Sequence, residues 1–118
     1  MFSLVNKPWG KFQNVLVGEN FLVKQIEIFP HSRFSLQKHF NRDEVHVIVK
    51  GSGILYFSND LGHLSSKKIV TGDVIKITRG QLHRIENDTD TTLVIVETQI
   101  GVCDENDIQR FEDDYGRA

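Results

Sequence analysis

The most constraining feature of the sequence is a regular alternation of short β-prone runs with turn-forming residues. Runs rich in Val, Ile, Leu and Phe are separated by Gly, Asn, Asp and Ser throughout the 118 residues, and this spacing is typical of strands rather than helices. Eight or nine strands in a chain of this length predict an all-β sandwich or small barrel. The predicted strands are Lys11–Leu16, Phe21–Ile28, Phe34–His39, Glu44–Val49, Gly53–Phe57, Leu64–Val70, Val74–Ile77, His83–Glu86 and Leu93–Gln99.

Composition predicts one ordinary globular domain spanning residues 1–118. A chain of this size buries enough apolar surface to fold without disulfides, and no segment has the composition of a linker. The formal net charge of −2 does not indicate a nucleic-acid-binding surface. The apolar runs are too short for a membrane helix, and no secretory signal pattern is recognisable. Together with the single Cys103, these features predict a cytoplasmic protein without nucleic-acid or membrane partners.

Turn chemistry marks two connections and a distinct C-terminal tail. The Asn, Asp and Gly residues in Asn59–Gly62 and Glu86–Asp90 predict hairpins at both places. Residues 103–118 form an acidic tail, whose Ile108, Phe111 and Tyr115 are spaced to dock on the sheet as a short turn or coil.

The segment Val45–Val49 is apolar on both faces except at His46. A strand covered on both sides has this composition, whereas a strand facing solvent alternates. One face is expected to line the interior and the other to pack against a second copy of the chain, which predicts a homodimer. Burial under the domain's own loops is the alternative.

Four polar residues predict a metal site: Gln37, His39, Glu44 and His83. Gln37 and His39 lie two positions apart on a predicted strand and therefore point to the same face. Glu44 opens the next strand, where an antiparallel neighbour brings its carboxylate opposite this pair, and His83 completes the set. Such a shell suits one divalent first-row ion, with Zn²⁺ as first choice and Mn²⁺, Fe²⁺, Ni²⁺ and Co²⁺ left open. A hydrogen-bonded polar core without metal is the alternative.

The spacing of these residues resembles the two motifs of the cupin superfamily. The matching patterns are Gln37-x-His39-(x)4-Glu44-(x)6-Gly51 and Gly72-(x)5-Thr78-x-Gly80-(x)2-His83-(x)3-Asn87. The resemblance implies a double-stranded β-helix, a jelly-roll barrel, with a metal between motif segments 37–51 and 72–87. Gln37 stands where the general pattern has a first histidine, and Thr78 where it has a proline.

Longer stretches resemble one family, the C-terminal cupin domain of type II mannose-6-phosphate isomerases. They are Lys7-Pro-Trp-Gly10, Ser35-Leu-Gln-x-His39, Arg42-x-Glu44, Gly80-x-x-His83-Arg-x-Glu-Asn87 and Asp107-Ile-x-Arg-Phe-Glu-Asp-Asp-Tyr-Gly-Arg117. In that family the domain often follows a mannose-1-phosphate guanylyltransferase, for which 118 residues leave no room. The expectation is therefore a free-standing cupin.

One loop departs from the family pattern. The family typically reads His-His-His-Arg-Ala-Glu-His-Trp, whereas this chain has His39-Phe-Asn-Arg-Asp-Glu-Val-His46. By strand parity His46 lies on the same face as Glu44 and is expected inside the barrel near the metal. A histidine at this position would offer the ligand an acid–base group, so the substrate or the reaction is expected to differ from the family's.

Position, for His46, and the resemblance, for the others, give candidate roles to several side chains. His46, Arg42 and Arg110 are the candidate catalytic residues, with His46 as the base. Arg42 is the preferred phosphate anchor, because a guanidinium matches phosphate oxygens. Lys24, Arg84 and Tyr115 are further candidate substrate-binding residues. For Arg84 and Arg110 the alternative is a solvated charge or an ion pair with the acidic tail.

The function expected from this pattern is a metal-dependent isomerase that converts mannose 6-phosphate to fructose 6-phosphate in the supply of activated mannose for surface polysaccharides. Its partner is therefore a small sugar phosphate. Two alternatives stay open. One is a non-catalytic module that binds a sugar or sugar nucleotide, favoured by the altered loop. The other is a different cupin enzyme, either a sugar-nucleotide epimerase or ketoisomerase or an Fe²⁺ dioxygenase.

Overall fold

The protein is all-β in the computed structural model, which describes residues 3–118. Within this range there are twelve strands. They are β1 (Leu4–Lys7), β2 (Gly10–Val17), β3 (Phe21–Ile28), β4 (Ser32–Arg33), β5 (Leu36–Lys38), β6 (Arg42–Lys50), β7 (Ser52–Ser58), β8 (Leu64–Val70), β9 (Val74–Ile77), β10 (His83–Asn87), β11 (Leu93–Gly101) and β12 (Gln109–Glu112).

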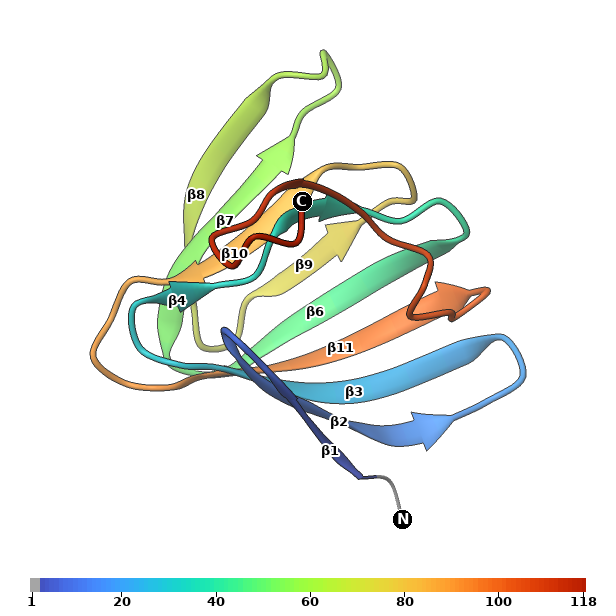
Figure 1. Cartoon of the computed structure of the whole chain (residues 1–118), viewed down its shortest axis with the longest axis horizontal. Coiled ribbons are helices and arrows are strands. Elements are labelled where there is room, and N and C mark those ends of the chain that lie inside the picture. Colours follow the sequence, from blue (N-terminus) through green and yellow to red (C-terminus); the bar gives the residue numbers. More distant parts are fainter. Residues whose placement is uncertain (1–2) are drawn as a thin grey trace.

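The strands form two antiparallel sheets that face each other (Figure 1). The first has the order β1-β2-β3-β11-β6-β9, and the second has the order β12-β5-β10-β7-β8, with β4 also paired to β10. Inward-facing residues alternate along the strands, as at Ile48 of β6 and at Leu93 and Ile95 of β11, which are at most 1% exposed. These residues pack against Leu55 and Ile85 of the opposite sheet to form the core.

All nine predicted strands are present, and three short strands were not predicted. The predicted strand Phe34–His39 is reduced to β5, with the two-residue β4 before it. Between them, the Phe34 carbonyl accepts a hydrogen bond from Arg84 and the Ser35 carbonyl accepts one from Gln37. Side chains thus occupy carbonyl groups that a continuous strand would use. The unpredicted strands are β1, which pairs with β2, β4, which pairs with β10, and β12, which pairs with β5.

The two predicted hairpins have different outcomes. Residues 59–62 do connect the paired strands β7 and β8. The hairpin predicted at Glu86–Asp90 is wrong, because β10 pairs with β5 and β7 whereas the next strand, β11, pairs with β3 and β6. Asn87 uses its side chain to cap this crossing: its amide nitrogen donates to the carbonyls of Ile28 and Thr91. The turn residues therefore mark a connection between sheets.

The C-terminal segment returns across the mouth of the molecule. In Figure 1 this red segment runs from the end of β11 back between the two sheets toward β10. It docks as predicted, but partly as strand β12 rather than only as turn or coil. Its Tyr115 is half-buried against the core. This segment therefore forms part of the wall around the interior.

Among residues 3–118 no helix has the length and apolar character needed to cross a membrane.

Candidate metal centre

The register of the first sheet places three ionisable side chains in one inward-facing row. Glu97 of β11 lies between its Cα partners Lys24 on β3 and His46 on β6. Directly paired residues of antiparallel strands point to the same face, so all three enter the interior. Each is buried: Lys24 is 4% exposed, His46 0% and Glu97 6%. Glu44, two residues before His46, extends this polar surface along β6.

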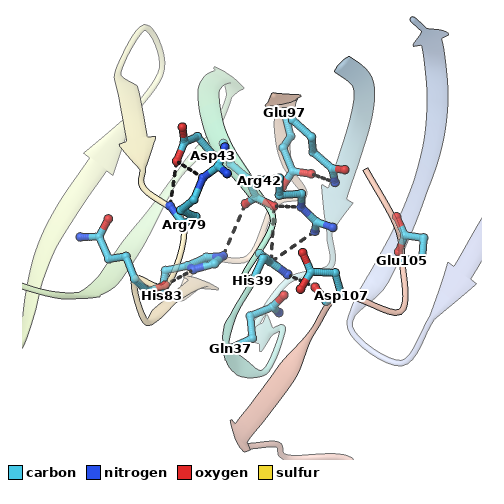
Figure 2. A network of polar contacts seen from close by, with 12 residues as sticks. Gln37, His39, Arg42, Asp43, Arg79, His83, Glu97, Glu105 and Asp107 are labelled. Carbon is cyan, nitrogen blue, oxygen red and sulfur yellow. Dashed lines mark hydrogen bonds and ion pairs between the residues drawn. The ribbon is translucent and has the colours of Figure 1, made fainter. Parts of the chain in front are cut away.

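Three of the four predicted ligands converge beside this row. His39, Glu44 and His83 each offer a ligand atom, and these atoms all lie within 4.8 Å of one another. The Nε2 atom of His39 lies 3.3 Å from Glu44 Oε2, and the Nε2 atom of His83 lies 3.5 Å from Glu44 Oε1. Figure 2 shows the imidazole of His39, which follows β5, and that of His83, which opens β10. The site is enclosed, since His39 is 5% exposed, Glu44 1% and His83 2%.

Backbone carbonyls orient both imidazoles toward Glu44. His39 Nδ1 lies 2.6 Å from the Asp107 carbonyl, and His83 Nδ1 lies 3.0 Å from the Gln81 carbonyl. A carbonyl only accepts hydrogen bonds, so Nδ1 carries the proton in each ring. The lone pair is therefore on Nε2, the atom that faces Glu44. This is the outer-shell arrangement that metal-binding histidines use, and the three side chains fit a divalent cation.

The protonation states suit cation binding. Burial lowers the pKa of His39 to about 4, with Arg42 adding to the effect and Glu44 opposing it, so the ring is neutral near pH 7. Burial would raise the pKa of Glu44, but the neighbouring imidazoles of His46 and His83 outweigh it and hold the pKa well below its ordinary value. A neutral imidazole and an ionised carboxylate are the forms that bind a metal ion.

Gln37, the fourth predicted ligand, lies on β5 directly opposite His83 of β10. Its amide nitrogen donates to the carbonyl and to the hydroxyl of Ser35, each at 3.2 Å. The amide oxygen is therefore the atom left for a ligand. Gln37 lines the same cavity as the three convergent residues, and its coordination of a metal stays a prediction.

Arg42 lies beside the cluster, but its guanidinium is already occupied. Its Nε donates to Glu44 at 2.9 Å, and one terminal nitrogen donates to the Asp104 carbonyl at 3.0 Å. The other terminal nitrogen lies 3.3 Å from His39 Nε2, the ring nitrogen that carries the lone pair. In Figure 2, Arg42 and Asp107 flank His39. Arg42 thus braces the ligands, and a cation would compete with it for His39.

His46 lies deeper than its predicted catalytic role requires. Its Nε2 is 3.0 Å from Glu44 and 3.2 Å from Glu97, and the ring does not line the cavity. Burial opposes its protonation, but Glu97 and Glu44 together raise the pKa of His46 above its ordinary value. Burial and the nearby Glu44 also raise the pKa of Glu97. His46 is therefore the buried partner of two carboxyl groups, Glu97 and Glu44, which themselves line the cavity.

Glu44, His46 and Glu97 also bring ligand atoms within 4.8 Å of one another. The Nδ1 atom of His46, however, is buried without a hydrogen-bond partner. A cation on Nε2 would force the proton onto Nδ1, and a buried N–H without an acceptor is costly. A proton on Nε2 shared between the two carboxyl groups fits this group better.

The cluster forms one wall of a cavity of about 480 Å³. Lys24 and Arg110 line it, together with Trp9, Phe34 and Glu105. Lys24 contacts Glu105 of the tail, with 2.5 Å between Nζ and the carboxylate. Burial opposes ionisation of Glu105, but Lys24 outweighs it and lowers the pKa of this carboxyl.

Two of the predicted substrate-binding residues lie outside this lining. Arg84 follows His83 on β10 and so points to the other face of the sheet, where it donates to the carbonyls of Phe34 and Glu112. Arg84 therefore binds the tail to the second sheet. For Arg84 the sequence left open an interaction with the acidic tail as the alternative to substrate binding, and the structure agrees with that alternative. Tyr115 packs against the core. The structure brings neither residue to the cavity.

Sequence reasoning missed three residues of the site: Glu97, Gln99 and Asp107. Glu97 and Gln99 occupy inward positions of β11, at the same parity as Leu93 and Ile95. A charged and an amide side chain at strand positions where apolar residues are expected could have identified them from the sequence. Asp107 acts partly through its backbone carbonyl, for which no sequence signal exists.

Comparison with known proteins assigns the chain to a family. Residues 1–113 match the family model described as mannose-6-phosphate isomerase C-terminal. The chain belongs to this family. The predicted resemblance, and the cupin barrel with it, is therefore confirmed.

The curated relatives are longer proteins. The chain is 33% identical to mannose-1-phosphate guanylyltransferase ManC of Salmonella typhimurium, with the match covering 100% of the chain and 24% of ManC. It is 34% identical to the alginate biosynthesis protein AlgA of Pseudomonas syringae, over 97% of the chain and 23% of AlgA. The chain thus spans about a quarter of the length of these relatives.

Solved structures share the fold at low sequence identity. The capsular polysaccharide assembling protein CapF from Staphylococcus aureus superposes with a TM-score of 0.82 at 20% identity, covering 95% of this chain and 34% of that one. Oxalate decarboxylase from Bacillus subtilis gives a TM-score of 0.82 at 17% identity, covering 93% of this chain and 30% of that one. At these sequence identities, both similarities show a shared fold and nothing further.

Proposed function

We propose that the protein is a metal-dependent sugar-phosphate isomerase that interconverts mannose 6-phosphate and fructose 6-phosphate and supplies activated mannose for polysaccharide synthesis. The observation that carries this proposal is the enclosed His39, Glu44 and His83 cluster in the wall of a cavity of about 480 Å³, in a member of the mannose-6-phosphate isomerase C-terminal family. The names of its relatives, which include alginate biosynthesis protein AlgA, support a role in polysaccharide synthesis.

Aldose–ketose isomerisation moves a proton between C2 and C1 of the sugar and shifts the carbonyl in the opposite sense. A divalent cation held by the cluster would act as a Lewis acid that polarises the sugar carbonyl. The chain itself must then supply a base near C2, a group that returns the proton to C1, and an anchor for the phosphate.

Glu97 is the proposed cavity-facing base. Its carboxyl lines the cavity, and burial with the neighbouring Glu44 raises its pKa, which makes it a stronger base than an ordinary carboxylate. Gln99 donates to one of its oxygens at 2.8 Å, while His46 Nε2 lies 3.2 Å from the other. In this scheme, His46, the base predicted from sequence, holds a proton behind Glu97 instead of touching the sugar.

We further propose that the protein works in the cytoplasm, because its single cysteine, Cys103, is free and fits a reducing compartment. Its substrate is proposed to be a small sugar phosphate rather than a nucleic acid.

A coupled assay for fructose 6-phosphate formed from mannose 6-phosphate tests the proposal, together with metal analysis of the purified protein. We expect turnover that stops on chelation and returns with an added divalent ion. Glu97→Gln should lower kcat at least about 100-fold, the range that loss of a general base produces. His39→Gln should stop turnover by removing a metal ligand. Arg42→Ala should lower activity about 10- to 100-fold, because Arg42 braces the ligands. Arg79→Gln is the matched control, because Arg79 is about half exposed, pairs with Asp43 and lies outside the cavity lining.

A metal-loaded protein without turnover on hexose phosphates would contradict the isomerase proposal. Binding of a sugar or sugar nucleotide by such a protein would support a non-catalytic module. Purification with bound iron would favour an oxygenase.

A further inference from the structure

The cationic side chains around the cavity differ in whether they already have partners. Arg42 is held by Glu44 and the Asp104 carbonyl, and Lys24 by Glu105. Arg117 makes two contacts with the Asp113 carboxylate, at 2.8 and 3.0 Å. Each of these groups would have to give up an existing contact to bind an anion. Arg42, the phosphate anchor preferred from sequence, is therefore poorly placed for that role.

Arg110 is different. Among residues 3–118 its guanidinium has no hydrogen bond or ion pair, and its Nε atom is buried without a partner. Yet the side chain lines the cavity. A guanidinium that has lost water from one of its donors without gaining an acceptor is costly in the free protein. An anionic ligand in the cavity would supply the missing acceptor.

Strand register places Arg110 in line with the candidate metal centre. Arg110 of β12 is the Cα partner of Gln37 on β5, and Gln37 is the Cα partner of His83 on β10. Directly paired residues point to the same face, so the three side chains enter the cavity in one row. Neighbouring strands lie about 4.8 Å apart, so the backbones at Arg110 and His83 are two strand spacings, or roughly 10 Å, apart across the sheet.

We propose that Arg110 binds the phosphate group of the substrate, with the sugar lying along the row from Arg110 past Gln37 to the metal cluster. This inference rests on the proposed function and identifies its phosphate site. The planar guanidinium offers two parallel N–H donors that match two phosphate oxygens. Phosphate at this end places the opposite, reacting end of the sugar beside His39, Glu44 and His83.

Lys7 is the competing cation. It also lines the cavity and forms no ion pair with residues 3–118. Its Nζ lies 5.9 Å from the centre of the Phe12 ring, however, and its charge helps to lower the pKa of Glu105. Lys7 therefore has an aromatic neighbour and no buried donor without an acceptor, whereas the Nε atom of Arg110 is such a donor.

Isothermal titration calorimetry of the full chain with mannose 6-phosphate, mannose and inorganic phosphate tests the inference. The wild-type protein should bind mannose 6-phosphate more tightly than mannose. In Arg110→Gln, affinity for mannose 6-phosphate and for phosphate should fall about 10- to 100-fold, the usual effect of losing a charged hydrogen-bond donor, while affinity for mannose stays unchanged. Arg110→Lys keeps the charge but loses the forked guanidinium, so its affinity for mannose 6-phosphate should lie between those of wild type and Arg110→Gln.

Arg79→Gln is the control, since it removes an equal charge outside the cavity. Circular dichroism and thermal melting establish that each variant is folded. Equal affinity of wild type and Arg110→Gln for mannose 6-phosphate would overturn the inference, and so would a wild type that does not prefer the phosphorylated sugar. Arg110-dependent preference in a protein without isomerase turnover would support the phosphate site and reject the proposed reaction.

Discussion

His39 illustrates how burial alone can prepare a ligand. Its pKa falls from 6.5 to about 4, mainly through burial. The unfolded chain therefore takes up a proton near pH 6.5, which the folded chain resists until about pH 4, so acid favours unfolding in this window. We expect His39 to contribute a decrease of roughly 3 kcal/mol to the free energy of unfolding of the metal-free protein between these pH values. Urea denaturation at a series of pH values measures this.

His39→Asn provides the comparison, because it removes the titrating ring. The stability difference between wild type and variant should shrink as the pH falls from 6.5 toward 4. Glu44 adds a loss of the same sign only below its ordinary value of 4.5. A difference that is constant across this range would show that His39 is not held neutral by the fold.

His46 separates two buried carboxyl groups, and its loss should be costly. Its Nε2 contacts both Glu44 and Glu97. His46→Leu keeps the volume but leaves the carboxylates without this partner, and breaking a buried ionic contact typically costs about 3–5 kcal/mol. Adding Glu97→Gln should restore part of that stability, because one of the two facing charges is then removed. Urea denaturation of the two single variants and the double variant measures the coupling.

A destabilisation below about 1 kcal/mol for His46→Leu would contradict this account, since effects that small are typical of substitutions at exposed positions. Additive effects of His46→Leu and Glu97→Gln would also contradict it, because residues in contact are expected to couple.

The tail links the fold to the metal centre at the level of elements. Asp107 accepts backbone hydrogen bonds from Phe40 and Asn41 on its carboxylate, both at 2.9 Å, and its carbonyl faces His39. Asp107→Ala would release this anchor and let His39 turn. Loss of an outer-shell partner weakens metal binding about 10- to 100-fold. We expect this decrease in competition titrations with a coloured chelator.

Asp114→Ala is the matched control for that experiment. Asp114 lies on the same tail and binds Arg33 through two contacts, at 2.7 and 3.0 Å, but it does not touch His39, Glu44 or His83. Its replacement should leave metal affinity unchanged. Equal losses in the two variants would mean that the tail acts only by general stabilisation.

Strands with a clear periodic pattern could be predicted, whereas contacts made by the tail could not. β3 has buried residues at alternate positions and β11 contains the β-branched run Val94–Val96, so their bounds were close to those observed. β12 has the sequence Gln-Arg-Phe-Glu, which shows no apolar alternation, and it is a strand only because β5 offers it a free edge. Pairing with a distant edge depends on the path of the whole chain, which no local pattern specifies.

The same division applies to the site. Ligand spacing was enough to bring together His39, Glu44 and His83, because strand parity and turn length largely fix their positions. Spacing could not show that Arg42 is occupied while Arg110 is unpartnered, since both outcomes depend on where the tail runs. Strand parity with His83 does place Arg84 on the opposite face, whereas the family pattern, which records residues and not the face of the sheet, does not.

At the scale of the whole molecule, the outer face of the first sheet is apolar. Val96, Val47 and Val74 are Cα partners in one row across β11, β6 and β9. Val47 is 36% exposed and Val74 65%, so loops within residues 3–118 do not cover this row. A contiguous apolar patch on a sheet face is typical of an interface. We therefore retain the homodimer as a prediction, with this face as its interface.

Light scattering coupled to gel filtration tests the dimer. Wild type should have twice the 13.5 kDa mass of one chain. Val47→Lys should give the monomer, because a two-fold interface places each substituted residue close to the same patch of the other copy and therefore confronts like charges. The control is Leu61→Lys, at a 79% exposed position of the β7–β8 connection, which should remain dimeric. Both variants should keep the wild-type circular dichroism spectrum, since neither changes a buried side chain. A monomeric wild type, or a Val47→Lys protein that is still dimeric, would remove this face as the interface.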